Sequence, residues 1–283
     1  MQDKELRALI SLLDDDDPEI LAHVENKIIS IGEEIIPVLE QEWELIPSSG
    51  TQSRIENLIH KLQFSRVKNS LALWNSEGAD DLLKGMYILA TYQYPQLELA
   101  SITKQIEQLY FQVWPKIKPD MHPYDQIRTL NQFFYSENKF QANKKNFHAP
   151  NNSFINVVLE SKKGIPLSMS VIYLLVAQRL GMPMYGVNLP NLFILTYQGT
   201  DKPFYINVYN SGLIFSKEDI DNYIKQLDVK PMDLFYQPCS NLSIIKRCIR
   251  NLIGAYEHNN MPEKVKEMEV LLTSISNGEE NSI

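Results

Sequence analysis

The sequence has few of the side chains that enzymes use as nucleophiles and general bases. Its 283 residues include two cysteines, Cys239 and Cys248, so the first 238 residues carry no thiol. Its five histidines leave the interval from 149 to 257 without an imidazole. Cysteine–histidine catalysis, in which a thiolate attacks and an imidazole takes up its proton, is therefore excluded from that interval unless another region supplies a residue.

Long apolar runs and basic stripes are also missing. The longest apolar run, Val171–Ala177, is far shorter than the roughly 20 residues of a membrane-spanning helix. The N-terminus lacks the basic and apolar regions of a secretory signal. The net charge of -8 would repel a phosphate backbone. We therefore expect a cytoplasmic globular protein with no membrane segment and no nucleic-acid partner; the oligomeric state stays open.

Cys239 and Cys248 lie nine residues apart. On one helix this spacing would place the two thiols on opposite faces, where they can neither pair nor share a metal ion. We expect two buried free thiols, no metal site and no cofactor.

The first third of the chain shows helical periodicity throughout. Two helical patterns lie between Leu6 and Trp43, and further helices are predicted around 53–63, 66–75, 79–91 and 97–114. Four aspartates precede Pro18, a residue suited to the first position of a helix. They lack the alternating oxygen ligands, glycine and closing glutamate of a calcium loop, so capping and solvation are favoured over calcium binding. Residues 1–95 are predicted to form a HEAT-like helical region.

The pattern changes in the middle of the chain. Helices are predicted over "YDQIRTLNQFFYSENK" and over "NNSFINVVLESKK", the second with Asn or Ser as its N-cap. After the helix at 167–180 come four short runs typical of strands, "MYGVNL", "LFILTY", "FYINVY" and "LIF", separated by turn residues. Ser216 and Asp219 then form a capping box. The pattern predicts an α+β fold, with residues 96–228 forming a core in which a buried helix packs on a small antiparallel sheet.

The two final helical patterns, over 240–260 and 261–275, predict a TPR-like hairpin within residues 229–283. One helix pair is too short for a repeat array, so it must pack on the rest of the chain.

The segment "GIPLSMSVIYLLVAQRLGMP", residues 164–183, is apolar around most of its helix and has clear ends. Pro166 suits the first helical position, and Gly181 with Pro183 marks the stop. A buried helix followed by antiparallel strands is the arrangement of papain-like thiol enzymes, whose nucleophile lies at the start of the helix.

This segment resembles the transglutaminase-like superfamily, which has Gly-x-Cys at the helix start and Gly-x-Pro at its end. The chain is most similar to the SirB-type regulator branch, through "DLLKGMYILATYQYPQLEL", "NSFINVVLESKKGIPLSMSVIYLLVAQRLGMP", "GVNLPNLFILTY", "YINVYNSG" and "SNLSIIKRCIRNLIGAYE". That branch joins a helical N-terminal region to a papain-like core and a TPR-like end.

The resemblance places the family's cysteine, histidine and acidic positions at Pro166, Leu192 and Asn207. Proline can neither attack nor donate a backbone N–H to an oxyanion, and neither leucine nor asparagine supplies the missing chemistry. We therefore expect a catalytically inactive protein that binds a protein or peptide partner as a regulator or scaffold.

Two alternatives remain open at this stage. A hydrolase or amidase with a displaced site would use Ser168 or Ser170 with His148, although small hydroxyls in a crowded helix usually bond to the preceding turn. A small-anion sensor would hold its ligand over the helix N-terminus near Lys163. Asn191, beside position 192, completes the set of candidate cleft residues; Lys162 is expected to be solvated.

Overall fold

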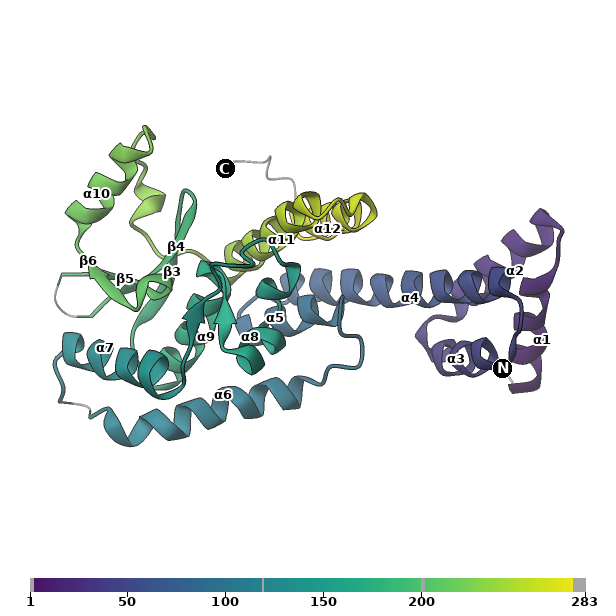
Figure 1. The fold of residues 1–283 in the computed structure, drawn as a ribbon, viewed down its shortest axis with the longest axis horizontal. Coiled ribbons are helices and arrows are strands. Elements are labelled where there is room, and N and C mark those ends of the chain that lie inside the picture. Colours follow the sequence, from purple (N-terminus) through teal and green to yellow (C-terminus); the bar gives the residue numbers. More distant parts are fainter. Residues whose placement is uncertain (1–2, 119, 200–201, 277–283) are drawn as a thin grey trace. The chain divides into compact units, whose positions relative to one another are not determined.

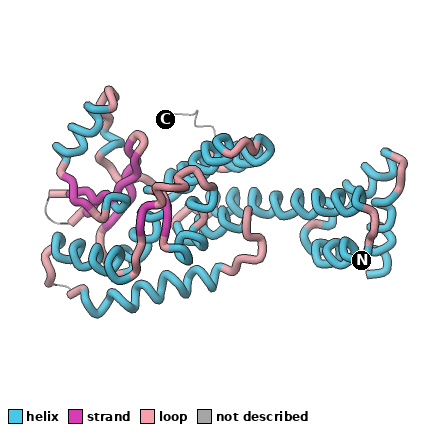
Figure 2. The backbone as a smooth tube through the Cα atoms, viewed as in Figure 1, coloured by secondary structure: helices cyan, strands magenta, loops and turns pink. Residues whose placement is uncertain are grey.

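The computed structural model describes residues 3–118, 120–199 and 202–276. The chain divides into two compact units, Met1–Ser70 and Leu71–Ile283. Figure 2 shows that helices make up most of the described chain, with the strands confined to the second unit. The predicted α+β class is confirmed, whereas the predicted division at 95 and 228 stays a prediction. No described helix is both long enough and apolar enough to cross a bilayer.

The first unit is helical. Its elements are α1 (Asp3–Ser11), α2 (Pro18–Ile31), α3 (Ile36–Leu45) and the first part of α4 (Ser49–Ser76). Their buried faces share one apolar cluster, which includes Ile10, Leu13, Ile28, Leu39 and Ile55.

The structure confirms the prediction for the acidic run and contradicts the prediction for the region of α4. Pro18 is the first residue of α2, and the Asp17 carboxylate accepts the Glu19 N–H at 2.8 Å, so the predicted capping role is confirmed. The prediction of separate helices at 53–63 and 66–75 is wrong. Because no glycine or proline interrupts residues 51–76, the helix continues through them.

The described residues of the second unit form nine helices, counting the end of α4, and two small sheets. The remaining helices are α5 (Leu82–Thr91), α6 (Leu99–Val113), α7 (Pro123–Asn131), α8 (Ile155–Ser161), α9 (Pro166–Arg179), α10 (Lys217–Gln226), α11 (Asn241–His258) and α12 (Pro262–Ser274), beside the end of α4. A π-helical turn, Gln132–Glu137, follows α7. The short strands β1 (Gln141–Ala142) and β2 (Lys163–Gly164) pair in parallel just before α9.

The four-stranded sheet is an antiparallel meander. Its strands, in spatial order, are β3 (Met184–Leu189), β4 (Leu192–Tyr197), β5 (Phe204–Asn207) and β6 (Leu213–Phe215). Leu189 pairs with Leu192 across a two-residue turn, Pro190–Asn191. Asn191 has a φ of 58°, which suits the third residue of a β-turn whose second residue is proline. Strand β5 is shorter than the predicted "FYINVY", because a 3-10 turn, Val208–Asn210, begins after Asn207.

Helix α9 is the centre of the second unit (Figure 1), which explains its apolar surface. It packs against α6, α8, α11, strands β3 and β4, and the 3-10 turn 208–210. Ten of its fourteen residues are buried, and Val171, Ile172, Val176 and Ala177 have no exposed surface. Full burial of each valine or isoleucine contributes about 1.5–3 kcal/mol. Gly181, with a φ of 76°, follows the helix as predicted.

Helices α11 and α12 form an antiparallel pair that packs on α5 and α9 through α11 (Figure 1). Ser216 and Asp219 form the predicted capping box at α10. The N-cap of α8 is Phe154 rather than Asn or Ser, because a 3-10 turn, Pro150–Ser153, takes up the polar residues before it.

Candidate functional site

The start of α9 is the position at which the sequence predicts a site. Pro166 is half-buried at the first helical position, after Ile165. The Ser168 hydroxyl accepts the Ile165 N–H at 3.1 Å and donates to the Ile165 carbonyl at 3.3 Å. Gly164 lies so close that a Cβ there would be 2.7 Å from the Ser168 Oγ. The Ser168 hydroxyl therefore closes the first turn of the helix.

Ser170 and His148 do not form a nucleophile–base pair in this structure. Ser170 is fully buried, and its hydroxyl has no hydrogen-bond partner among the described residues. His148 is exposed, and its ring stacks on that of His258 at a centroid distance of 4.2 Å. A serine needs a hydrogen-bonded base for activation, and no hydrogen bond links His148 to either serine within the described chain.

Leu192 and Asn207, the other two positions that the resemblance assigns to the family's triad, make packing and capping contacts. Leu192 begins β4 and packs against an apolar cluster that joins the sheet to α10 and includes Ile194 and Ile220. Asn207 is buried at the end of β5, where its Oδ1 accepts the Asn210 N–H at 3.1 Å. These side chains therefore pack a sheet face and cap a turn.

The two remaining candidate residues lie at the surface. Lys163 is exposed on β2, and Asn191 is exposed in the β3–β4 turn. Lys162 differs from the prediction of a solvated side chain: it is half-buried, and its Nζ lies 4.7 Å from the centre of the Phe140 ring. Burial lowers the pKa of this amine.

A loop beside the α9 start carries a small aromatic group. The Phe147 ring meets those of His148 and Tyr209 edge to face. Buried Asn152 holds this loop, because its Nδ2 donates to the Asn146 and Phe147 carbonyls at 2.6 and 3.0 Å. Asn152, one of the residues that could have capped α8 by the prediction, therefore orders the segment that presents His148.

A second ring group lines a hollow of about 290 Å³ at the start of α7. The rings of His122, Tyr124, Phe204 and Tyr197 stack in one column, with successive centroid distances of 5.4, 4.4 and 5.1 Å. Because Phe204 and Tyr197 are largely buried, this column packs the start of α7 on β4 and β5.

A hollow of about 780 Å³ lies at the other end of α9. Three segments distant in sequence form its walls: the α4–α5 turn, the end of α9 with β3, and the start of α11. Its lining residues are Asn75, Gly78, Ala79, Asp80, Asp81, Leu82, Leu175, Gln178, Tyr185, Cys239, Ser240, Asn241 and Leu242. We call this hollow the acidic cavity, because Asp80 and Asp81 are its charged lining residues.

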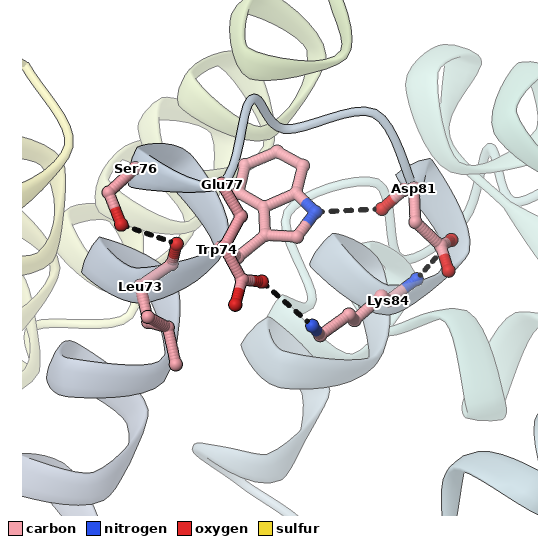
Figure 3. A network of polar contacts seen from close by, with 6 residues as sticks. All are labelled: Leu73, Trp74, Ser76, Glu77, Asp81 and Lys84. Carbon is pink, nitrogen blue, oxygen red and sulfur yellow. Dashed lines mark hydrogen bonds and ion pairs between the residues drawn. The ribbon is translucent and has the colours of Figure 1, made fainter.

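Hydrogen bonds to residues outside the acidic cavity hold one of its walls in place (Figure 3). The buried Trp74 indole donates to the Asp81 carbonyl at 2.8 Å, and the Asp81 carboxylate accepts the Lys84 N–H at 2.9 Å. Gly85 permits this packing, since a Cβ there would lie 2.8 Å from the indole. The Lys84 amine pairs with Glu77 at 3.2 Å.

The opposite wall carries Cys239. The Cys239 N–H donates to the Gly186 carbonyl at 2.8 Å, which ties the segment before α11 to β3. Burial raises the pKa of its thiol to about 11, so this thiol is a poor nucleophile at neutral pH. Both cysteines are free as predicted, but Cys239, just before α11, is half-buried rather than buried as the prediction had it.

No local pattern in the sequence indicates the acidic cavity. An Asp-Asp pair before an apolar helix is typical of an N-cap, and Asp81 has that role. The cavity arises only when three distant segments meet, so no local spacing identifies it. Within residues 3–118, 120–199 and 202–276, no group of three or more His, Cys, Asp or Glu side chains is placed to hold a metal ion.

The sequence matches one family model and is similar to several known proteins. A family model described as "Transglutaminase-like superfamily" matches residues 100–250. The chain is 25% identical over 211 residues to a UPF0162 protein of Xylella fastidiosa, covering 67% of this chain and 72% of that protein. It is 28% identical over 188 residues to a UPF0162 protein of Vibrio cholerae, covering 63% and 65%. It is 27% identical over 136 residues to human F-box only protein 21, covering 45% and 21%. No solved structure matches the chain.

Proposed function

Because the chain belongs to the transglutaminase-like superfamily, we propose that it is a catalytically inactive member that binds a protein or peptide partner as a cytoplasmic regulator or scaffold. The observation that carries this proposal is Pro166 as the first residue of α9. A proline ring has no nucleophilic atom, and its nitrogen carries no hydrogen for an oxyanion. Two contributions that the superfamily takes from this position are therefore missing together.

The missing base supports the same proposal. No histidine occurs between residues 149 and 257, which include every strand of the four-stranded sheet. Leu192 packs with apolar side chains, and Asn207 caps a turn. A papain-like mechanism needs an imidazole beside the nucleophile and an acidic group to orient it. These positions supply neither group.

The helical segments around the core favour binding as the remaining role. The SirB-type resemblance implies a HEAT-like region before the core and a TPR-like hairpin after it, and helical repeats commonly form binding surfaces. In this structure Met261, the N-cap of α12, and Val270, on α12, are each more than two-fifths exposed. The acidic net charge makes a protein partner more favourable than a nucleic acid.

The test combines capture with reconstitution and an activity screen. The full chain would be the bait, because α11 packs on α5 and α9 and its removal would open the core. Each captured protein would then be purified and titrated against the full chain by calorimetry. We expect a defined complex and no turnover of amide, peptide or transamidation substrates. Turnover abolished by a substitution in the α9 region would overturn the proposal, as would the failure of every purified candidate to bind.

A further inference from the structure

The acidic cavity carries charges that the described residues do not neutralise. Asp80 and Asp81 line it, and none of its lining residues is Lys, Arg or His. The Lys84 amine is paired with Glu77, as Figure 3 shows. Within the described chain, the Asp80 carboxylate has neither a hydrogen bond nor an ion pair. The cavity therefore presents two negative charges to whatever enters it.

Three amide side chains of the cavity have oxygen atoms available as hydrogen-bond acceptors. The amide nitrogens of three lining residues are already used: Asn75 donates to the Ile275 carbonyl, Gln178 to the Met184 carbonyl, and Asn241 to the Ala79 and Asp80 carbonyls. Their amide oxygens accept no hydrogen bond from a described residue. A ligand rich in N–H donors fits this set, and a guanidinium carries five.

Apolar and aromatic surface accompanies these acceptors. Leu82, Leu175 and Leu242 line the same cavity, and the ring of Tyr185 on β3 is 42% exposed. The aliphatic stem of a long basic side chain packs on such leucines, and its cation is attracted by an aromatic face. A volume of about 780 Å³ exceeds one side chain and suits a short stretch of peptide.

From these observations we infer that the acidic cavity binds a basic segment of a partner protein, with an arginine or lysine side chain held by the carboxylates of Asp80 and Asp81. This inference rests on the proposed function and names the chemistry of the partner. The cavity walls are already fixed by the Trp74–Asp81 and Cys239–Gly186 hydrogen bonds. Binding therefore requires little ordering of the protein.

The test begins with a displayed library of random 12-residue peptides selected on the full chain. An enriched peptide and its arginine-to-citrulline counterpart would then be titrated by fluorescence anisotropy. The key variant is Asp80→Asn with Asp81→Asn, because an asparagine oxygen keeps the cap of α5 while both charges are lost. The matched control is Asp228→Asn, an exposed aspartate with a φ of 55° that asparagine tolerates.

We expect enriched peptides to carry a basic residue and to bind the double variant about tenfold or more weakly, since an ion pair to a carboxylate is lost. The Asp228→Asn control is expected to bind within about twofold of the wild type, and citrulline to weaken binding as the double variant does. Tyr185→Leu should weaken binding of the same peptide, because the aromatic face is lost. Equal thermal melting of all variants would show that the fold is kept.

Three results would overturn the inference: no enrichment, enrichment of peptides without basic residues, or unchanged affinity in the double variant. Direct binding of spermidine in calorimetry, with no peptide enriched, would instead assign the cavity to a free polyamine. If a reconstituted partner binds wild type and double variant equally, the proposed function stands and the cavity inference falls. Catalytic turnover would remove the proposed function whatever the peptide titration shows.

Discussion

The hydroxyl of Tyr173 donates a hydrogen bond to the Asn131 Oδ1 at 2.9 Å, and the Asn131 Nδ2 donates to the Gly212 carbonyl at 3.0 Å. These two bonds join α9 to α7 and to the turn between β5 and β6. Gly212 has a φ of 70°, and a Cβ there would lie 2.0 Å from the Asn131 side chain. Only glycine fits this position, so the turn and the amide are built around each other.

Removal of one partner at this junction should destabilise the fold by an amount that depends on which atom stays unpaired. Tyr173→Phe leaves an unpaired amide oxygen and should cost about 0.5–1.5 kcal/mol. Asn131→Ala leaves both a fully buried phenol and the Gly212 carbonyl unpaired, so we expect a larger loss, about 2–4 kcal/mol. Urea unfolding of the full chain measures both. The exposed Tyr185→Phe is the control, and equal losses for the two junction variants would contradict the account.

Alkaline pH should destabilise the protein through its buried phenols. Burial raises the pKa of Tyr173 well above its ordinary value, and it also raises that of Tyr135. Above about pH 10 the unfolded chain loses these protons while the folded chain keeps them, so the free energy of unfolding falls as pH rises. Each such group contributes a slope of about 1.4 kcal/mol per pH unit.

Comparison of variants isolates this effect. Tyr173→Phe should flatten the loss of stability between pH 10 and 11 by about that slope, measured by urea unfolding at each pH. Stability that falls equally in the wild type and in the Tyr173→Phe variant would argue against a protonated Tyr173 in the folded state.

Two glycine-to-alanine changes should have opposite effects on stability. A Cβ at Gly186 would lie 2.5 Å from the Phe193 ring and 3.2 Å from the Cys239 sulfur. The β3 wall of the acidic cavity would have to move, which should cost about 1–3 kcal/mol. A Cβ at exposed Gly254, within α11, would meet nothing within 4 Å. Alanine there should stabilise by about 0.5–1 kcal/mol because it favours the helix. Thermal melting distinguishes the two, and a stabilised Gly186→Ala would refute the packing argument.

Much of the fold follows from local patterns in the sequence. Pro166 and Gly181 mark the ends of α9, and strands β3, β4 and β6 match their predicted runs, because hydrophobic period and turn residues act locally. The capping box at Ser216 follows from local pattern in the same way, and the nine-residue spacing of the two cysteines predicts the free thiols.

Features set by tertiary contacts could not be predicted in this way. Asn152 is of a residue type that commonly caps helices, but its side-chain amide holds the loop that carries His148 instead. Lys162 has the sequence context of a solvated residue, but it lies over the Phe140 ring. Asp80 and Tyr185 are 105 residues apart and meet at one cavity only through the packing of α9. No spacing along the chain encodes such a meeting.

Pro166→Cys tests how much of a thiol enzyme remains around α9. A cysteine at this position would gain the N-terminal end of the α9 dipole, which lowers a thiol pKa below about 8.5. We expect faster alkylation by iodoacetamide at pH 7 than for a cysteine at exposed Gln108, in the middle of α6. Both variants would be made with Cys239→Ala; Cys248 stays silent because burial raises its pKa to about 12.

The same variant should nevertheless fail to turn over substrate. The sheet offers Leu192 and Asn207 where a base and its orienting acid would be needed, so an acylated thiol would not be regenerated efficiently. With an activated ester we expect at most one equivalent of product per protein, followed by the background rate. Sustained turnover by the Pro166→Cys variant would mean that another residue serves as the base. His148→Ala in that background would then show whether the exposed His148 imidazole is that base.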